Sequence, residues 1–207
     1  MTRTVLVPRE RVVRWFENFA TRHGPAAFTT TSSGGLRATS PDGAEAVARL
    51  PFDEPYDGPA DPVALAAAVT MPTRWGLLLV RKGGFAVAVV ELGRVTDSKV
   101  GRRHVQGRTK AGGQSQQRFA RRRDNQARQA YEAAAGHARR VLAGPLSALV
   151  CGGDRQAVDQ VLSDPRLRPL SELRVEPWLA VPDPSGAVLA QAVIDAAAVR
   201  ITVTDEP

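Results

Sequence analysis

The stretch WGLLLVRKGGFAVAVVEL, residues 75–92, decides the fold of the second half of the chain. It contains two near-continuous apolar runs, 75–82 and 85–92, which meet at Gly83-Gly84. This pattern predicts a β-hairpin whose strands are buried on both faces. Further strands are expected at 94–104, 148–153, around 172–180 and at the terminal VRITVTD.

Helical patterns alternate with these strands. After Gln114 an apolar stripe continues to Val141 and stops at Gly144-Pro145, which predicts a long helix. Two more helices are expected at 154–163, with Asp154 as its cap, and at 186–198. We therefore expect an α/β domain over residues 73–207, in which a mixed β-sheet is flanked by helices.

The first 72 residues have a different pattern. Residues 8–22 read as an amphipathic helix that ends at His23-Gly24. The following segment, punctuated by Gly34-Gly35 and Pro41-Asp42-Gly43, predicts two or three short antiparallel strands. A Pro/Asp/Gly-rich linker follows at 53–62. Residues 1–72 are thus expected to form a small α+β N-terminal module.

The composition limits where the protein works. Of the 207 residues, 43% are hydrophobic, and no apolar run approaches the ~18 residues that a membrane helix requires. The N-terminus becomes charged before a signal-peptide core could form. The single cysteine, Cys151, allows no internal disulfide and no cysteine-type zinc site. We expect a cytoplasmic protein without a membrane partner, a metal or another cofactor.

Positive charge is concentrated in one part of the chain. Residues 101–140 contain eleven arginines or lysines and two acids, so this segment has a charge of +9, whereas the whole chain has +7. Few acids are available to pair with the arginines at helical spacing. One strongly basic segment on a mildly acidic body is typical of a polyanion-binding protein.

Within this segment, GRTKAGGQSQQRFARRRDNQAR, residues 107–128, has an unusual tip. Gly112 and Gly113 let the backbone approach another surface closely. No Asp, Glu or Cys lies within ten residues before Gln114 or nine after it, and His104 is the one titratable base nearby. Self-sufficient acid–base or nucleophilic hydrolysis is therefore poorly supported. Any chemistry here must orient water or offer amide dipoles to developing charge.

The segment GGQSQQRFARRR closely resembles the catalytic loop in the middle domain of eukaryotic and archaeal class I translation termination factors. The resemblance covers residues 74–205 and keeps the order of apolar hairpin, basic strand, GGQ loop, long helix and ALVCGG strand. It implies a release-factor middle-domain fold with an RNase H-like core. It also implies that the loop enters the peptidyl transferase centre and promotes hydrolysis of the ester between nascent peptide and tRNA.

The resemblance also implies roles for individual residues. The backbone N–H of Gln114 would stabilise charge at the ester, its side chain would place water, and Gly112 and Gly113 would permit entry into the RNA pocket. The basic residues around the loop would contact ribosomal RNA or tRNA phosphates; these are Arg102, Arg103, Arg108, Lys110, Arg118, Arg121, Arg122 and Arg128. The expected partners are the large ribosomal subunit and peptidyl-tRNA, bound by a monomer, with no DNA.

The first 72 residues contain no signature of a codon-reading domain. The chain is therefore most similar to the release-factor-like peptidyl-tRNA hydrolases of ribosome-associated quality control, the Vms-type branch with actinobacterial single-domain relatives. This implies codon-independent hydrolysis on stalled or split large subunits. The alternative is a non-enzymatic rRNA- or tRNA-binding module of the same fold. A nuclease is disfavoured, because the acids are scattered in loops rather than clustered for metal ions.

Overall fold

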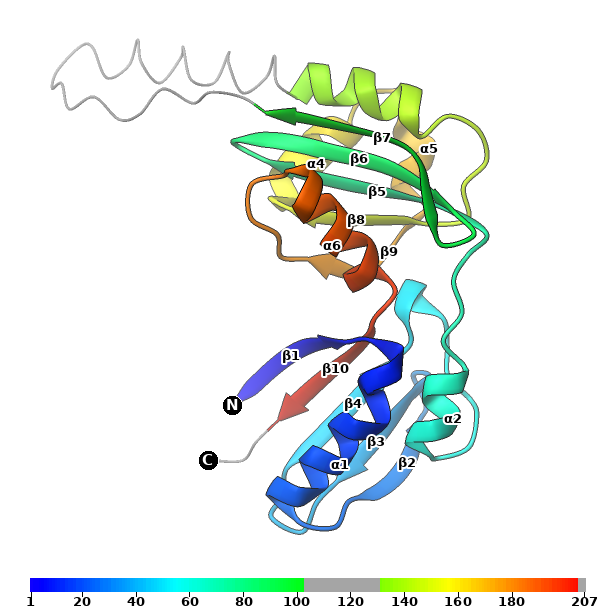
Figure 1. The fold of residues 1–207 in the computed structure, drawn as a ribbon, viewed down its shortest axis with the longest axis vertical. Helices are drawn as coiled ribbons and strands as arrows, with labels where there is room; N and C mark the ends of the chain where they lie inside the picture. Colours follow the sequence, from blue (N-terminus) through cyan, green and yellow to red (C-terminus); the bar gives the residue numbers. More distant parts are fainter. Residues whose placement is uncertain (103–130, 205–207) are drawn as a thin grey trace, which may run out of the picture. The chain divides into compact units, whose positions relative to one another are not determined.

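The computed structural model describes residues 1–102 and 131–204, and the chain divides into two compact units (Figure 1). The first unit comprises Met1–Met71 together with Val193–Pro207, and the second comprises Pro72–Ala192. Each unit is built around its own five-stranded sheet. The mixed α/β class expected from the sequence is confirmed.

The sheet of the second unit has the strand order β7-β6-β5-β8-β9. Its strands are β5 (Arg74–Arg81), β6 (Gly84–Glu91), β7 (Arg94–Arg102), β8 (Leu149–Gly153) and β9 (Arg174–Leu179). The β5–β6 and β6–β7 pairs are antiparallel, whereas β8 pairs with β5 and with β9 in parallel. In this mixed sheet β5, β6 and β7 form an antiparallel meander, whereas β8 and β9 are added in parallel through crossover connections.

The predicted hairpin of β5 and β6 forms the centre of this sheet. Six consecutive residues are buried in each strand, 75–80 and 85–90. Side chains of alternate residues point to opposite faces of a strand, so burial of both sets means that both faces are covered. Leu78, Val80, Val87 and Val89 belong to one apolar cluster with the helical segment 131–141 and α4.

In the described part of this unit, four helical segments accompany the sheet: 131–141, α4 (Arg155–Leu162), α5 (Arg168–Ser171) and α6 (Gly186–Ala196). Asp154 caps α4 as predicted, because its carboxylate accepts hydrogen bonds from the backbone N–H groups of Gln156 (3.0 Å) and Ala157 (3.4 Å). The short helix α5 was not predicted, because four residues are too few to show a helical repeat of apolar side chains. No helix of the described residues is both long and apolar enough to cross a bilayer.

The first unit places two helices on an antiparallel sheet (Figure 1). The strand order is β1-β10-β4-β3-β2, formed by β1 (Thr2–Val7), β2 (Ala27–Thr31), β3 (Gly35–Thr39), β4 (Glu45–Arg49) and β10 (Val199–Thr204). Its helices are α1 (Val12–His23), preceded by a 3-10 turn η1 (Arg9–Arg11), and α2 (Pro62–Ala67). A second 3-10 turn, η2, spans Pro51–Asp53.

The sequence predicted much of this unit correctly. Helix α1 ends at His23, where Gly24 adopts φ 91°, a conformation that favours glycine. The three strands β2, β3 and β4 form hairpins at the two predicted turns, with Gly34 at φ 72° and Gly43 at φ 84°. Strand β1 and helix α2 were not predicted.

The last strand belongs to a different sheet from the one expected. The sequence suggested a domain of residues 73–207 that includes this strand. In the structure β10 pairs antiparallel with β1 and with β4, so it lies in the sheet of the first unit. Its alternating pattern explains why: Val199, Ile201 and Val203 are buried in the core of that unit, while the residues between them are more exposed.

Candidate functional site

The predicted catalytic loop lies outside the described residues. This applies to Gly112, Gly113 and Gln114, and to the basic residues Arg103, Arg108, Lys110, Arg118, Arg121, Arg122 and Arg128. Arg102 is the last residue of β7, where its backbone pairs with Gly84. The structure therefore describes the two elements that flank the segment 103–130, strand β7 and the helical segment 131–141.

The end of β7 packs closely against β6. Gly101 pairs with Phe85, whose ring occupies the space where a side chain at residue 101 would begin. Gly101 does not have a positive φ, so the close contact rather than the backbone conformation requires glycine here. The ring of Phe85 is itself 8% exposed and belongs to the core. The contact fixes the backbone of β7 one residue before Arg102.

The helical segment 131–141 packs on the same core through small side chains. Ala134, Ala135, Ala138 and Val141 are buried in the cluster that contains Phe85. At its far end Arg74 of β5 donates hydrogen bonds to the carbonyl oxygens of residues 143 (2.8 Å) and 145 (2.6 Å), and to Glu91 (2.6 Å). The helical segment is thus held to the sheet along its length and at its C-terminal end.

A histidine joins the helical segment to the sheet. The imidazole of His137 stacks on Phe85, with ring centroids 5.4 Å apart and planes inclined by 24°. Arg140 Nη2 donates a hydrogen bond of 3.3 Å to Nδ1 of His137, since a guanidinium can only donate. Burial, with the nearby charges of Arg140 and Lys99, lowers the pKa of His137. Burial and the two neighbouring positive charges each favour the neutral form of the imidazole.

The exposed side of the helical segment forms an open groove of about 540 Å³. We call this the basic groove; its lining residues are Ala133, Gly136, His137, Arg139 and Arg140. Gly136 leaves open space where a side chain would begin. Among the described residues two arginines and no acid line it, so it is suited to an anion such as a phosphate.

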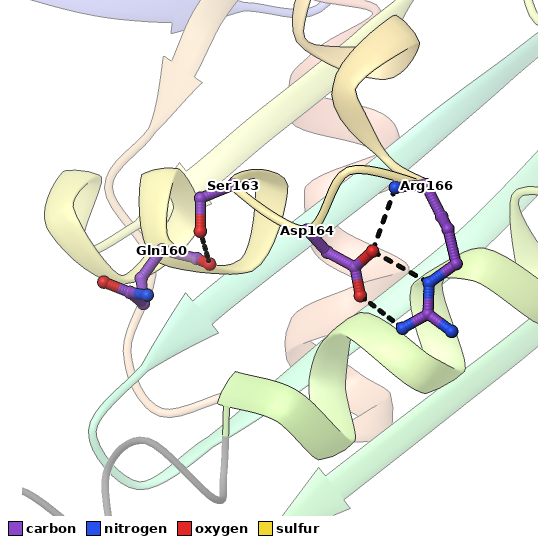
Figure 2. A network of polar contacts seen from close by, with 4 residues as sticks. All are labelled: Gln160, Ser163, Asp164 and Arg166. Atoms are coloured by element: carbon purple, nitrogen blue, oxygen red, sulfur yellow. Dashed lines mark hydrogen bonds and ion pairs between the residues drawn. The ribbon is translucent and has the colours of Figure 1, made fainter.

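A second cavity, of about 530 Å³, lies between the start of the helical segment and the end of α4. Asp164 and Arg166 form a forked ion pair there, with distances of 2.9 Å (Nε to Oδ1) and 2.6 Å (Nη2 to Oδ2), as Figure 2 shows. The Arg166 guanidinium and backbone N–H lower the pKa of Asp164 to about 2. Next to it, the hydroxyl of Ser163 donates to the carbonyl oxygen of Gln160 (2.8 Å). These bonds stabilise the turn after α4, and they engage the polar groups of Ser163, Asp164 and Arg166 with neighbouring residues.

The described residues show neither a cluster of metal ligands nor a reactive thiol. Within ranges 1–102 and 131–204 no three His, Cys, Asp or Glu side chains gather as a metal site. Burial raises the pKa of Cys151 to about 12, so its thiol is not a nucleophile near neutral pH.

Four residues of this site were not predicted to take part in it: Lys99, His137, Arg139 and Arg140. The two arginines were counted in the basic segment, but no role was assigned to them. The exposure of Arg139 and Arg140 could have been predicted from the sequence. They directly follow Ala138 on the apolar stripe, and residues that follow a buried position of a helix lie on its exposed side. The stack of His137 on Phe85 joins residues 52 positions apart in the sequence, so no local sequence pattern predicts it.

Comparisons with known proteins place the chain in a family. The sequence model described as "Actinobacteria/chloroflexi VLRF1 release factor" matches residues 73–202. No curated protein matches the sequence.

Three solved structures are similar to the chain. An archaeal protein has 15% identity and a TM-score of 0.35, with 77% of this chain and 51% of that one covered. An archaeal translation termination factor, aRF1, has 13% identity and a TM-score of 0.39, with 94% and 64% covered. Pelota from Archaeoglobus fulgidus has 11% identity and a TM-score of 0.30, with 94% and 62% covered. The chain thus spans between half and two thirds of the length of these structures.

The family match includes the flanking strand β7, the segment 103–130 and the helical segment 131–141. It covers well over half of the sequence. The chain therefore belongs to the Actinobacteria/chloroflexi VLRF1 release factor family.

Proposed function

We propose that the chain is a codon-independent peptidyl-tRNA hydrolase acting on stalled or split large ribosomal subunits. Its Gly112-Gly113-Gln114 tip enters the peptidyl transferase centre and releases the nascent peptide. The observation that carries this proposal is the match to the VLRF1 release factor family over residues 73–202, since the matched range includes this tip.

The proposed reaction needs little from the protein beyond positioning. Water attacks the ester carbonyl, the bond to the tRNA ribose oxygen breaks, and the peptide leaves as a carboxylic acid while the tRNA regains its hydroxyl. The backbone N–H of Gln114 stabilises the oxyanion that forms during attack, and its side chain places the water. The lack of neighbouring acids and bases around Gln114 is consistent with this division of work.

The basic groove supports the same proposal from the described residues. Arg139 and Arg140 bind ribosomal RNA phosphates and extend the contact made by Arg118, Arg121, Arg122 and Arg128 on the preceding residues. Because the pKa of His137 is lowered, the positive charge of the groove comes from the arginines and stays constant near neutral pH. Binding through this groove is therefore expected to depend on salt more than on pH.

The test is peptide release from purified large subunits that carry peptidyl-tRNA, without any mRNA. The wild-type chain is expected to release the peptide, and Gln114→Ala is expected to bind the same particles without releasing it. Hydrolysis of peptidyl-tRNA by Gln114→Ala at the wild-type rate would contradict the proposal.

The alternative is a non-enzymatic rRNA- or tRNA-binding module. The observation that favours it is the basic groove, whose two arginines suit it to binding an anion. The same release experiment separates the two, since a binding module associates with the subunits and leaves the peptidyl-tRNA intact.

A further inference from the structure

The first unit contains a small pocket that the proposed function does not use. It lies between β1 and the second half of α1, and its volume is about 180 Å³. We call it the α1 pocket; its lining residues are Arg3, Trp15, Asn18, Phe19, Arg22 and His23. This volume is well below that of a site for a drug-sized molecule, and suits one ring or one small charged group.

Helix α1 builds one wall of the pocket from a single stripe. Trp15, Asn18, Phe19 and Arg22 follow the spacing i, i+3, i+4, i+7, so they lie on one side of the helix. The ring of Phe19 is buried and stacks on Trp15, with centroids 5.7 Å apart and planes inclined by 13°. Trp15 remains partly exposed. The stack holds an accessible indole in a fixed position.

Strand β1 supplies an arginine where the sheet pattern calls for an apolar residue. Arg3 pairs with Val203 of β10, while Val5 and Val7 pair with Ile201 and Val199. All three partners on β10 are buried in the core, so Arg3 belongs to the row of residues that faces α1. Its charge is therefore presented to the pocket.

The charges of the pocket are not neutralised by its own walls. Of the residues that the structure describes, none that lines the pocket is acidic. Neither Arg3 nor Arg22 makes an ion pair with any residue in the described ranges, and the indole N–H of Trp15 makes no hydrogen bond there. Nδ1 of His23 contacts Asp42 at 2.8 Å, and that carboxylate also accepts from the backbone N–H of Ala44, so this acid is already engaged.

We infer that the α1 pocket binds one nucleotide of single-stranded RNA. Its base stacks on Trp15, and Arg3 and Arg22 bind the phosphates on either side. An aromatic ring between cations is the usual means of holding single-stranded nucleic acid, because every base has a π-face and guanidinium groups form forked contacts with phosphate. Asn18 offers both a donor and an acceptor for the 2′-hydroxyl, the group that distinguishes RNA from DNA.

This site lies in the first unit and does not involve Gln114, so it can exist whether or not the proposed hydrolysis occurs. It gives that unit a role of its own, as a second RNA contact. An arginine facing inward on an edge strand can also serve to prevent strand pairing with another chain. The experiment below distinguishes this role from RNA binding, because a merely protective arginine leaves Trp15 unaffected by RNA.

The test uses the full chain labelled with 5-fluorotryptophan, because the first unit is formed by two separate parts of the sequence. The fluorine signal of Trp15 is assigned by its loss in Trp15→Phe and is followed while an eight-residue oligouridylate is added. Fluorescence anisotropy of the labelled oligomer reports total binding, including binding by the basic segment. A saturable shift of the Trp15 signal is expected in the wild-type chain.

The matched variants separate the pocket from general charge. In Arg3→Ala/Arg22→Ala the affinity read from Trp15 is expected to fall about tenfold or more, because two charge-assisted hydrogen-bonding groups are removed. Arg9→Ala/Arg11→Ala removes the same charge from exposed positions of η1, outside the pocket, and should leave the shift intact. Unchanged methyl NMR signals of Val12 and Ile201, which are buried in the core of the first unit, show that this unit is folded in each variant.

Three control ligands define the occupant. An abasic oligomer of the same length, the matching deoxyuridine oligomer and an oligoglutamate peptide should each shift Trp15 less than oligouridylate does. The inference is overturned if Trp15 does not respond while anisotropy shows the RNA to be bound. It is also overturned if the abasic, DNA or peptide probe shifts Trp15 as strongly as RNA.

Discussion

The imidazole of His137 stacks on the ring of Phe85 at a centroid distance of 5.4 Å, and this pair joins the helical segment 131–141 to strand β6. Phe85 also lies directly against Gly101 of β7. One aromatic ring therefore contacts both elements that flank the segment 103–130. The packing around this ring therefore joins the strand before the segment 103–130 to the helical segment after it.

Gly101→Ala is expected to destabilise the protein by about 1–3 kcal/mol, because the new methyl group would collide with the buried ring of Phe85. The measurement is the free energy of unfolding in urea. The double variant Gly101→Ala/Phe85→Leu should recover part of the stability, since the smaller side chain makes room.

Gly136→Ala is the matched control for this change. It also adds a methyl group to a glycine, but in a helix and facing open space, and should stabilise the protein by about 0.5–1 kcal/mol. Equal effects of the two alanine substitutions would contradict the role given to the Phe85 contact.

The lowered pKa of His137 predicts a specific pH dependence of stability. The unfolded chain binds a proton at this residue at a higher pH than the folded chain does. The free energy of unfolding should therefore fall as the pH is lowered from about 7.5 through the ordinary histidine value of about 6.5 and on through the folded pKa. In His137→Phe, which keeps a ring against Phe85, this part of the pH dependence should disappear. Parallel curves for the two proteins would refute the prediction.

The ion pair of Asp164 and Arg166 predicts an acid-sensitive turn (Figure 2). Because the folded pKa of Asp164 is about 2, its stabilising effect should be complete above about pH 4 and be lost as the pH falls toward that value. Carboxyl-carbon NMR should show a raised pKa for Asp164 in Arg166→Leu. In Asp164→Asn the free energy of unfolding should vary less over the same acidic range. A pKa of Asp164 that is the same with and without Arg166 would contradict the assignment.

Much of the fold could be predicted because its signals are local. The apolar runs of β5 and β6, the cap at Asp154 and the end of α1 at Gly24 each follow from neighbouring residues. The place of β10 could not be predicted this way. Its pairing with β1 joins the two ends of the chain, and an alternation of buried and exposed residues does not show which strands will pair with it.

The candidate site could be predicted from the sequence only in part. The residues Gly112, Gly113 and Gln114 are predicted from their motif, and they stay a prediction because they lie outside the described residues. The surroundings of that segment needed the structure, because the basic groove combines Arg139 and Arg140 with a histidine that is held by a distant strand. A sequence shows the charges, whereas packing decides which side of the helix presents them.

The basic groove predicts salt-dependent binding to the large subunit. In Arg139→Ala/Arg140→Ala the slope of log K against log salt should decrease by about 1.4–1.8, because two arginines no longer neutralise phosphates. Arg94→Ala/Arg168→Ala removes equal charge at exposed positions of the same unit, outside the groove, and should leave the slope nearly unchanged. Affinity measured over a salt series checks both variants. Equal slopes for the two double variants would remove the groove from the binding surface.

The most direct measurement is the single-turnover rate of peptide release from large subunits that carry peptidyl-tRNA, made with saturating wild-type or Gln114→Ala protein. We predict that Gln114→Ala lowers the rate at least about 100-fold, because it removes the side chain that places the water and leaves only the backbone N–H, while its affinity for the particles is unchanged. Release by Gln114→Ala at the wild-type rate would contradict the account.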